Sequence, residues 1–232
     1  MRQVPTIVAI SRFLQEYIST HAGLDSRLIR LPVYGQGPFR ALGKFDTGYV
    51  TMVNPCALKG LSLFMSLAGQ FPDTEFAAVP TWGADDKVLN DLKSLSNVRV
   101  LPPSDEIEHI LEQTRVLLVP SLWPETFGYV VPEAMLRGIP VIASDVGGLS
   151  EAKLGVDYLL PVNPAVRQGD TYVCPPQDAA PWAGALRELL ADREAYARCA
   201  RESRDAALRF LPSTSVSQFE ALLHELEKNR DR

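Results

Sequence analysis

The feature that most constrains the fold is a repeated alternation of short apolar runs with amphipathic segments. The apolar runs are TIVAI (6–10), GYVTMV (48–53), EFAAVP (75–80), NVRVL (97–101), RVLLVP (115–120) and PVIAS (140–144). Most are apolar at consecutive positions, which is typical of strands covered on both faces. Helical patterns follow the runs, at 11–21, 59–70, 85–95, 105–113, 128–138 and 147–154. This order predicts an α/β fold, with a doubly wound and mostly parallel sheet of about six strands and helices on both faces.

Beyond residue 160 the alternation gives way to a Pro-rich meander at 161–177. Three further helical patterns follow, at 178–190, 192–210 and 214–229. We expect one domain over residues 1–195 and a helical C-terminal tail over 196–232, packed on that domain or on a domain outside this chain. The tail has apolar positions that need a partner surface or a dimer contact to cover them: Val216, Phe219, Leu222, Leu223 and Leu226.

Composition narrows the class of partner. The 232 residues carry a net charge of −5 and no basic stretch interleaved with aromatics, which argues against a nucleic-acid binder. Three cysteines without a C-x-x-C pair indicate reduced thiols, and the three histidines show no zinc spacing. We expect no signal peptide, and no apolar run approaches the roughly 18 residues of a membrane span. We therefore expect a cytoplasmic protein, with peripheral membrane contact left open.

The segment PETFGYVVPEAM (124–135) contains a helix start. Pro132 lacks a backbone N–H, so it is tolerated only in the first turn of a helix. The helix is therefore expected to begin near Gly128 or Tyr129, directly after the strand RVLLVP. Unpaired N–H groups around residues 126–130 then form an anion site at the carboxyl edge of the sheet.

Two glutamates bracket this apolar segment, Glu125 in the loop and Glu133 in the helix. A carboxylate accepts hydrogen bonds from the neighbouring hydroxyls of a ribose or a sugar. The residues alone leave two interpretations open. The glutamates flank a nucleotide-sugar site, or one favours a helix start and the other is a solvated helical residue.

The longer stretch VLLVPSLWPETFGYVVPEAMLRGIPVIASDVGGLSEA resembles the signature of retaining glycosyltransferases of family 4, which have the GT-B superfold. It contains the E-x7-E pattern and, in order, the FG, EAM, G-x-P-V-x-A-S and GG-x-x-E elements. The stretches AISRFLQEYISTHAGL and LKGLSLFMSLAGQFPDTEF resemble the entry to the C-terminal domain and its first phosphate-side helix. The resemblance implies a Rossmann-like domain, one half of a GT-B fold, that binds a UDP-, GDP- or ADP-linked sugar without a metal. It also implies that transfer to an acceptor needs an N-terminal domain, supplied in cis or in trans.

The resemblance assigns roles to individual residues. Glu125, with the amides of Phe127 and Gly128, is implied to hold the hydroxyls of the donor sugar. Lys59 matches the lysine that contacts the diphosphate, where its charge stabilises the leaving phosphate. Glu125 and Lys59 are therefore the expected catalytic residues, and Glu133 is expected to hold the ribose.

Two further segments match parts of the family's donor site. The strand end Val100-Leu101-Pro102-Pro103 matches the segment that holds the base through backbone groups, which makes Leu101 and Pro103 candidate binding residues. Gly147 and Gly148 match the tight turn beside the donor.

One position departs from the family pattern. The family usually has Gly-Arg five residues before the diphosphate lysine, whereas this chain has Val53-Asn54. Asn54 donates hydrogen bonds but carries no charge, so either Arg137 or Lys153 replaces the missing cation or the donor binds less tightly. An Asx turn before Pro55 is an equal alternative for Asn54.

The missing arginine also favours a second class of function, a non-catalytic module that binds a nucleotide sugar or a partner protein. A GT-B relative with other chemistry, such as a sugar epimerase or a phosphorylase, is a weaker alternative. Trp82 and Trp123 lie just beyond strand ends, and we interpret both as packed core aromatics rather than pocket walls.

Overall fold

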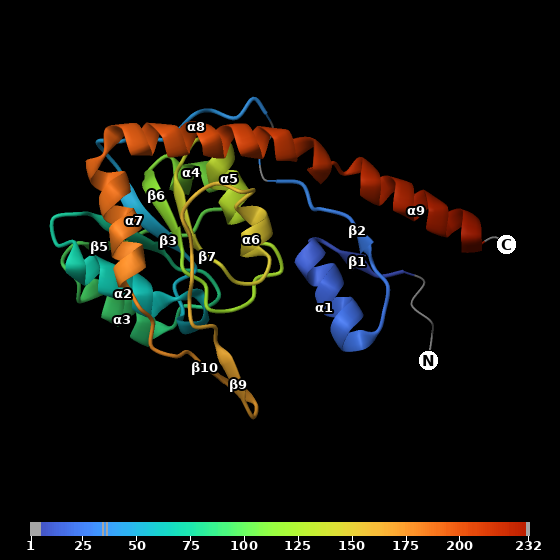
Figure 1. Ribbon diagram of the computed structural model, residues 1–232, viewed down its shortest axis with the longest axis horizontal. Helices are drawn as coiled ribbons and strands as arrows, with labels where there is room; N and C mark the ends of the chain where they lie inside the picture. The colour runs from blue at the N-terminus through green and yellow to red at the C-terminus, as the bar shows by residue number, and fades with distance from the viewer. Residues whose placement is uncertain (1–5, 34, 36, 231–232) are drawn as a thin grey trace.

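The computed structural model describes residues 6–33, 35 and 37–230, and its centre is a six-stranded sheet (Figure 1). The strands are β3 (Tyr49–Val53), β4 (Phe76–Val79), β5 (Val98–Val100), β6 (Thr114–Val119), β7 (Val141–Ser144) and β8 (Leu159–Leu160). Their order across the sheet is β5-β4-β3-β6-β7-β8, and every neighbouring pair is parallel. The predicted parallel α/β fold is therefore confirmed.

The membership of the sheet differs from the prediction at one strand. The predicted strand at 6–10 forms β1 (Val8–Ala9), which pairs with β2 (Arg27–Leu28) in a separate parallel sheet. The prediction that it joins the main sheet is wrong, because its backbone is already paired with the β2 segment through bonds such as Ile29 N–H to Ala9 C=O, 2.9 Å. The sixth place is taken by β8, which has only two residues and no periodic pattern that sequence reasoning detects.

The helices between the strands fix where a ligand can bind. They are α2 (Leu61–Gln70), α3 (Asp86–Lys93), α4 (Ile107–Leu111), α5 (Val130–Leu136) and α6 (Leu149–Ala152), with a 3-10 turn η1 (Ala57–Lys59) before α2. The chain moves outward from β3 to β4 and β5, and then returns to the other side of β3 to form β6, β7 and β8. Right-handed crossovers in opposite directions place helices on both faces. The reversal between β3 and β6 leaves a crevice at their carboxyl ends, where such sheets bind ligands.

The core lies on both faces of the sheet. All four residues of β4 are fully buried, as are those of β7. Phe64 of α2 meets Phe76 of β4 edge-to-face, with ring centroids 5.5 Å apart. Burial of each such ring contributes on the order of 1.5–3 kcal/mol. The site at the carboxyl edge is therefore built on a rigid base.

The C-terminal part begins with a hairpin of β9 (Val166–Gln168) and β10 (Thr171–Val173), followed by α7 (Ala180–Ala191), α8 (Arg193–Phe210), η2 (Leu211–Thr214) and α9 (Ser217–Arg230). Helix α7 packs on α2, and α8 packs along α5 and α7. The domain boundary predicted at 195/196 falls inside α8, which buries Tyr196 and Cys199 in the main core. No described helix combines the length and the apolarity needed to cross a membrane.

A second region lies to one side of the sheet, as Figure 1 shows, and we call β1, α1 (Arg12–Ala22), β2 and α9 the arm. Helix α1 begins at the N-cap Ser11, whose hydroxyl accepts the N–H of Leu14, 3.0 Å, but it buries none of its residues. Arg27 of β2 pairs with Glu225 of α9, 2.6 Å. Leu222 of α9 is buried, so the apolar stripe of the tail is covered in part by this chain itself.

Candidate functional site

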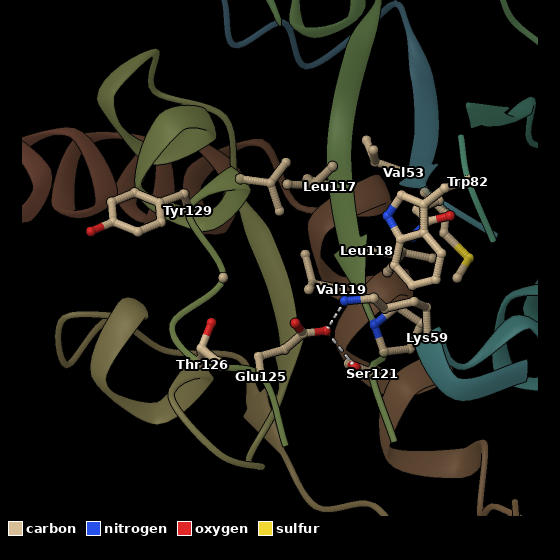
Figure 2. Close-up of a pocket in the computed structure, with 15 residues that line it drawn as sticks. Val53, Lys59, Trp82, Leu117, Leu118, Val119, Ser121, Glu125, Thr126 and Tyr129 are labelled. Carbon is tan, nitrogen blue, oxygen red and sulfur yellow. Dashed lines mark hydrogen bonds and ion pairs between the residues drawn. The ribbon is translucent and has the colours of Figure 1, made fainter. Parts of the chain in front are cut away.

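A cavity of about 310 Å³ opens at the carboxyl ends of β3 and β6, where the strand order reverses (Figure 2). The residues that line it are Met52, Val53, Asn54, Lys59, Trp82, Leu117, Leu118, Val119, Pro120, Ser121, Glu125, Thr126, Gly128, Tyr129 and Val130. Figure 2 shows Lys59, Val53 and Trp82 on one side, with Thr126 and Tyr129 on the other. The two predicted catalytic residues, Lys59 and Glu125, therefore lie together in this cavity.

Lys59 and Glu125 form an ion pair across the cavity. Their side chains retain 24% and 15% exposure, so both remain in reach of solvent. The hydroxyl of Ser121 donates to the same oxygen, Glu125 Oε1, at 2.7 Å and holds the carboxylate from behind. Among the described residues that line the cavity, Lys59 is the only lysine, arginine or histidine. A ligand anion that binds Lys59 must therefore exchange with a carboxylate that is already there.

The loop after Glu125 supplies backbone donors. In the described part of the chain, the N–H groups of Phe127, Gly128 and Tyr129 donate no hydrogen bond. Gly128 and Tyr129 line the cavity, whereas the Phe127 ring is fully buried against Tyr129 and Phe210. Helix α5 follows with Tyr129 as its N-cap and Pro132 in the first turn, in agreement with the predicted helix start.

Glu133 lies apart from this loop. Its side chain on α5 is only 5% exposed, and it is not among the residues that line the cavity. Its backbone C=O accepts Nη1 of Arg137 at 2.9 Å, and Arg137 in turn pairs with Glu108. The two glutamates of the sequence pattern thus occupy different environments, and the ribose-binding role of Glu133 stays a prediction.

Asn54 adopts a left-handed backbone conformation, φ 58°, at the end of β3. Its side-chain oxygen accepts the N–H of Gly83, 29 residues away, at 3.0 Å, so it does not form the Asx turn considered above. The prediction that Arg137 or Lys153 replaces the missing cation is wrong. Arg137 and Lys153 are each 1% exposed and lie outside the cavity, and Lys153 Nζ donates to the Val141 carbonyl at 2.7 Å.

The glycine pair after β7 supports the loop rather than lining the cavity. A Cβ on Gly147, which has φ 59°, would lie 2.7 Å from the backbone of Pro124, and one on Gly148 would lie 2.6 Å from the carbonyl oxygen of Thr126. The Gly148 N–H also donates to the Glu125 carbonyl at 2.7 Å. Only glycines allow the β7–α6 turn to approach the Glu125 loop so closely.

The predicted base-binding segment lies at the end of β5. Leu101 donates its N–H to the Ala78 carbonyl at 2.9 Å, which continues the β4–β5 ladder, and Pro103 is exposed. Neither residue lines the cavity. Strand β4 lies between β5 and β3, so the end of β4 separates Leu101 and Pro103 from Lys59, which follows β3. Their role in binding a base stays a prediction.

Sequence reasoning missed Ser121 and misjudged Trp82. Ser121 lies two residues after the end of β6, at the point where the strand order reverses, and this position is the signal that could have marked it. Trp82 is 82% exposed and lines the cavity, so its interpretation as a packed core aromatic is wrong. Trp123 is half-buried, with its ring edge-to-face against Tyr172 at 4.6 Å.

Ser11, which precedes α1, and Leu31, which lies beyond β2, both contact the site through polar groups. The hydroxyl of Ser11 donates to the Thr126 carbonyl, and the N–H of Leu31 donates to the Tyr129 hydroxyl at 2.6 Å. Burial raises the pKa of Tyr129, which keeps this hydroxyl protonated. Within the described ranges, no group of three or more His, Cys, Asp or Glu side chains is arranged to hold a metal ion.

Comparisons with known proteins agree on the class of this domain. Residues 48–192, more than half of the chain, match the family described as Glycosyl transferases group 1. The chain is 32% identical over 124 residues to a D-inositol 3-phosphate glycosyltransferase of Corynebacterium efficiens, and the match covers 53% of this chain and 26% of that protein. It is 27% identical over 142 residues to an N-acetyl-alpha-D-glucosaminyl L-malate synthase of Bacillus anthracis, covering 60% of this chain and 34% of that protein.

Solved structures share the fold at low sequence identity. A sucrose-phosphate synthase from Thermosynechococcus elongatus superposes with a TM-score of 0.75 at 22% identity, over 98% of this chain and 59% of that one. The Anabaena protein HepE, solved with UDP and glucose, gives 0.71 at 20% identity, over 98% and 64%. The sheet order and the crevice define a Rossmann-like α/β domain, which these structures share. The chain belongs to the Glycosyl transferases group 1 family, and it spans about a quarter of the first of these curated relatives and a third of the second.

Proposed function

We propose that this chain is the donor-binding domain of a retaining glycosyltransferase of family 4. It binds a nucleotide-diphosphate sugar and presents the hexosyl group for transfer to an acceptor. The observation that carries the proposal is the accessible Lys59–Glu125 pair, which lies beside unpaired backbone N–H groups at the reversal point of the sheet.

In this proposal the diphosphate takes the place of Glu125 as the partner of Lys59. The carboxylate is then released toward the sugar, where it accepts hydrogen bonds from hydroxyls, and the amides of Phe127 and Gly128 donate to the same sugar. Ser121 keeps the released carboxylate at the cavity wall, because its hydroxyl donates to Glu125 Oε1 independently of Lys59.

The chemistry follows from the same placement. The bond between the anomeric carbon and the phosphate oxygen breaks, and its electron pair goes to the leaving phosphate. The Lys59 ammonium stabilises that charge as it develops. We propose that no metal ion is needed for this stabilisation. The acceptor oxygen attacks the same face and passes its proton to the leaving phosphate, so that the configuration is retained.

The acceptor side belongs to further polypeptide, supplied in cis or in trans. Two observations support this. The chain covers only part of the length of each relative. Helix α1 of the arm buries none of its residues, and two apolar side chains there, Tyr17 in the helix and Leu24 just beyond its end, are about half exposed. We therefore propose that the chain alone binds donor and turns over little of it. Leu223 of α9 is 59% exposed, so a dimer contact through the tail is a second way in which the exposed apolar side chains of the arm could be covered.

The compartment is proposed from the cysteines. Cys56, Cys174 and Cys199 are all free thiols, which fits a reducing cytoplasm, and peripheral membrane contact stays compatible with it.

A second candidate is a non-catalytic module that binds a nucleotide sugar or a partner protein. The observation that favours it is that Lys59 is the single cationic side chain among the described residues of the cavity wall. Asn54 stands where the resemblance to family 4 implies a second cation, and its side-chain oxygen accepts the N–H of Gly83.

The test is a thermal-shift panel with UDP-, GDP- and ADP-glucose, because a ligand that binds the folded state raises Tm by mass action. We expect one of the three to raise the Tm of the chain, with no change after addition of a chelator. Adding an acceptor-side polypeptide then separates transfer from binding alone. If none of the three shifts the chain, donor binding is contradicted and the protein-interaction module is favoured.

A further inference from the structure

Trp82 is the most exposed large hydrophobic side chain among the described residues, at 82%. It also lines the cavity, on the side where Lys59 lies (Figure 2). An isolated exposed tryptophan needs no explanation, but one that walls a polar cavity presents a flat aromatic face to whatever binds there. The indole is not required for the core and is free to contact a ligand.

The turn that carries Trp82 is held in place. It follows β4 and closes with a long hydrogen bond from the Ala84 N–H to the Thr81 carbonyl, 3.5 Å. The N–H of Gly83 donates to the side-chain oxygen of Asn54 at 3.0 Å. A Cβ on Gly83 would lie 2.7 Å from that same oxygen, so the two residues pack without spare room. Asn54, itself 8% exposed, thus fixes the turn against the end of β3.

The sheet order shows which part of a donor meets this ring. Along the carboxyl edge, Glu125 follows β6, Lys59 follows β3, and Trp82 follows β4. Neighbouring strands lie about 4.8 Å apart, so the ends of β6 and β4 are about 10 Å apart. If the sugar lies at Glu125 and the diphosphate at Lys59, the nucleoside extends away from the sugar, toward the end of β4. The group that reaches Trp82 is then the nucleoside and not the sugar.

We propose that Trp82 is the stacking surface for the base of the donor nucleotide, and that the Asn54–Gly83 hydrogen bond positions the turn that presents it. The inference rests on the proposed donor-binding function and adds a side-chain contact to a base that backbone groups alone were expected to hold. Every base has a π face, so the contact strengthens binding of UDP, GDP and ADP alike and does not select among them.

The test compares Trp82→Ala with the unchanged chain by calorimetric titration of UDP, GDP, ADP and inorganic pyrophosphate. Stacking of one base contributes about 5- to 150-fold in affinity. We expect Trp82→Ala to lose a factor in this range for each nucleotide that binds, to keep its affinity for pyrophosphate, and to be partly rescued by Trp82→Phe. Tyr17→Ala, which removes an exposed aromatic of α1, is the matched control and should bind like the unchanged chain.

Fluorescence gives a second readout. Trp182 is fully buried and Trp123 half-buried, so an added nucleotide should quench mainly Trp82, and Trp82→Phe should abolish the change. Gly83→Ala keeps the indole but displaces the turn, so it should weaken nucleotide binding and leave pyrophosphate binding unchanged. Equal nucleotide affinity in Gly83→Ala would overturn the positioning role of the Asn54–Gly83 bond.

The outcomes separate the two proposals. If the unchanged chain and Trp82→Ala bind a nucleotide equally, or if Trp82→Ala weakens pyrophosphate to the same degree, base stacking is overturned while donor binding stands. If the unchanged chain binds neither a nucleotide nor pyrophosphate, the donor-binding function fails and the stacking role fails with it.

Discussion

The cavity and the helical layer behind it both contain charged side chains, but these side chains differ in their exposure to solvent. In the cavity, Lys59 and Glu125 are paired and still 24% and 15% exposed. In the layer behind it, Glu133, Arg137 and Lys153 are between 1% and 5% exposed. The first pair can exchange partners with a ligand, whereas the second group is committed to bonds inside the protein.

This difference in exposure distinguishes charged residues that can bind a ligand from charged residues that stabilise the fold. Residue type alone does not make this distinction. Removing one partner of a buried charge leaves the other uncompensated, which costs stability. An accessible pair contributes little to stability, so its residues are available for binding. Charged residues within one forty-residue motif should therefore divide into variants that lose stability and variants that lose ligand.

The largest stability effect is expected for Glu133→Ala. The carboxylate is buried, and its removal should lower the free energy of unfolding by about 2–3 kcal/mol, which corresponds to a decrease in Tm of roughly 5–10 °C. Glu125→Ala should change Tm far less because its pair is accessible. Thermal melts of both variants measure this, and equal melting temperatures would remove the distinction between the two regions.

Glu125→Gln should instead show itself in ligand binding. Loss of the charge weakens hydrogen bonds to the sugar by about 1.4 kcal/mol, or tenfold, while it frees Lys59 for the diphosphate. We therefore compare the affinity for a nucleoside-diphosphate glucose with the affinity for the same nucleoside diphosphate without the sugar. The ratio of the first affinity to the second should fall about tenfold. The affinity for the diphosphate itself should stay equal or rise. A parallel loss for both ligands would show that Glu125 only maintains the cavity.

The smallest effect concerns Lys153. Burial lowers the pKa of Lys153 from 10.5 to about 8. Between these two values the unfolded chain binds more protons than the folded one, so this group makes the folded state more stable as the pH rises from about 8 to 10.5. The contribution approaches about 1 kcal/mol per pH unit. Urea titrations at pH 8, 9 and 10 should show this rise in the unchanged chain relative to Lys153→Met, and parallel pH profiles would contradict it.

Sequence reasoning succeeded where periodicity and covalent limits act locally. Consecutive apolar positions identified five of the six described strands of the main sheet, and the missing N–H of Pro132 placed the start of α5. It failed where a contact depends on distant chain. The partner of β1 and the acceptor of the Gly83 N–H lie 19 and 29 residues away in sequence, counted from Val8 to Arg27 and from Asn54 to Gly83.

Burial was the other property that the motif did not reveal. Spacing placed Glu125 and Glu133 on one crevice, but a seven-residue helix packed under α8 turns the second into the interior. Trp82 was assigned to the core on residue type alone, yet its turn extends past the sheet edge into solvent. Residue type and spacing predicted which segments build the site, and tertiary packing decided which of their side chains enter it.

The most direct test of the cavity as a donor site is calorimetric titration of UDP, GDP and ADP into the unchanged chain, Lys59→Met and Lys87→Met. Lys87 is a matched control because it pairs with Asp91 on the exposed face of α3. A hydrogen bond to a charged group contributes roughly 1.5–3 kcal/mol, so Lys59→Met should bind about 10- to 150-fold more weakly and Lys87→Met should bind normally. Equal affinity in all three proteins would contradict the account, because the diphosphate would then bind somewhere other than at Lys59.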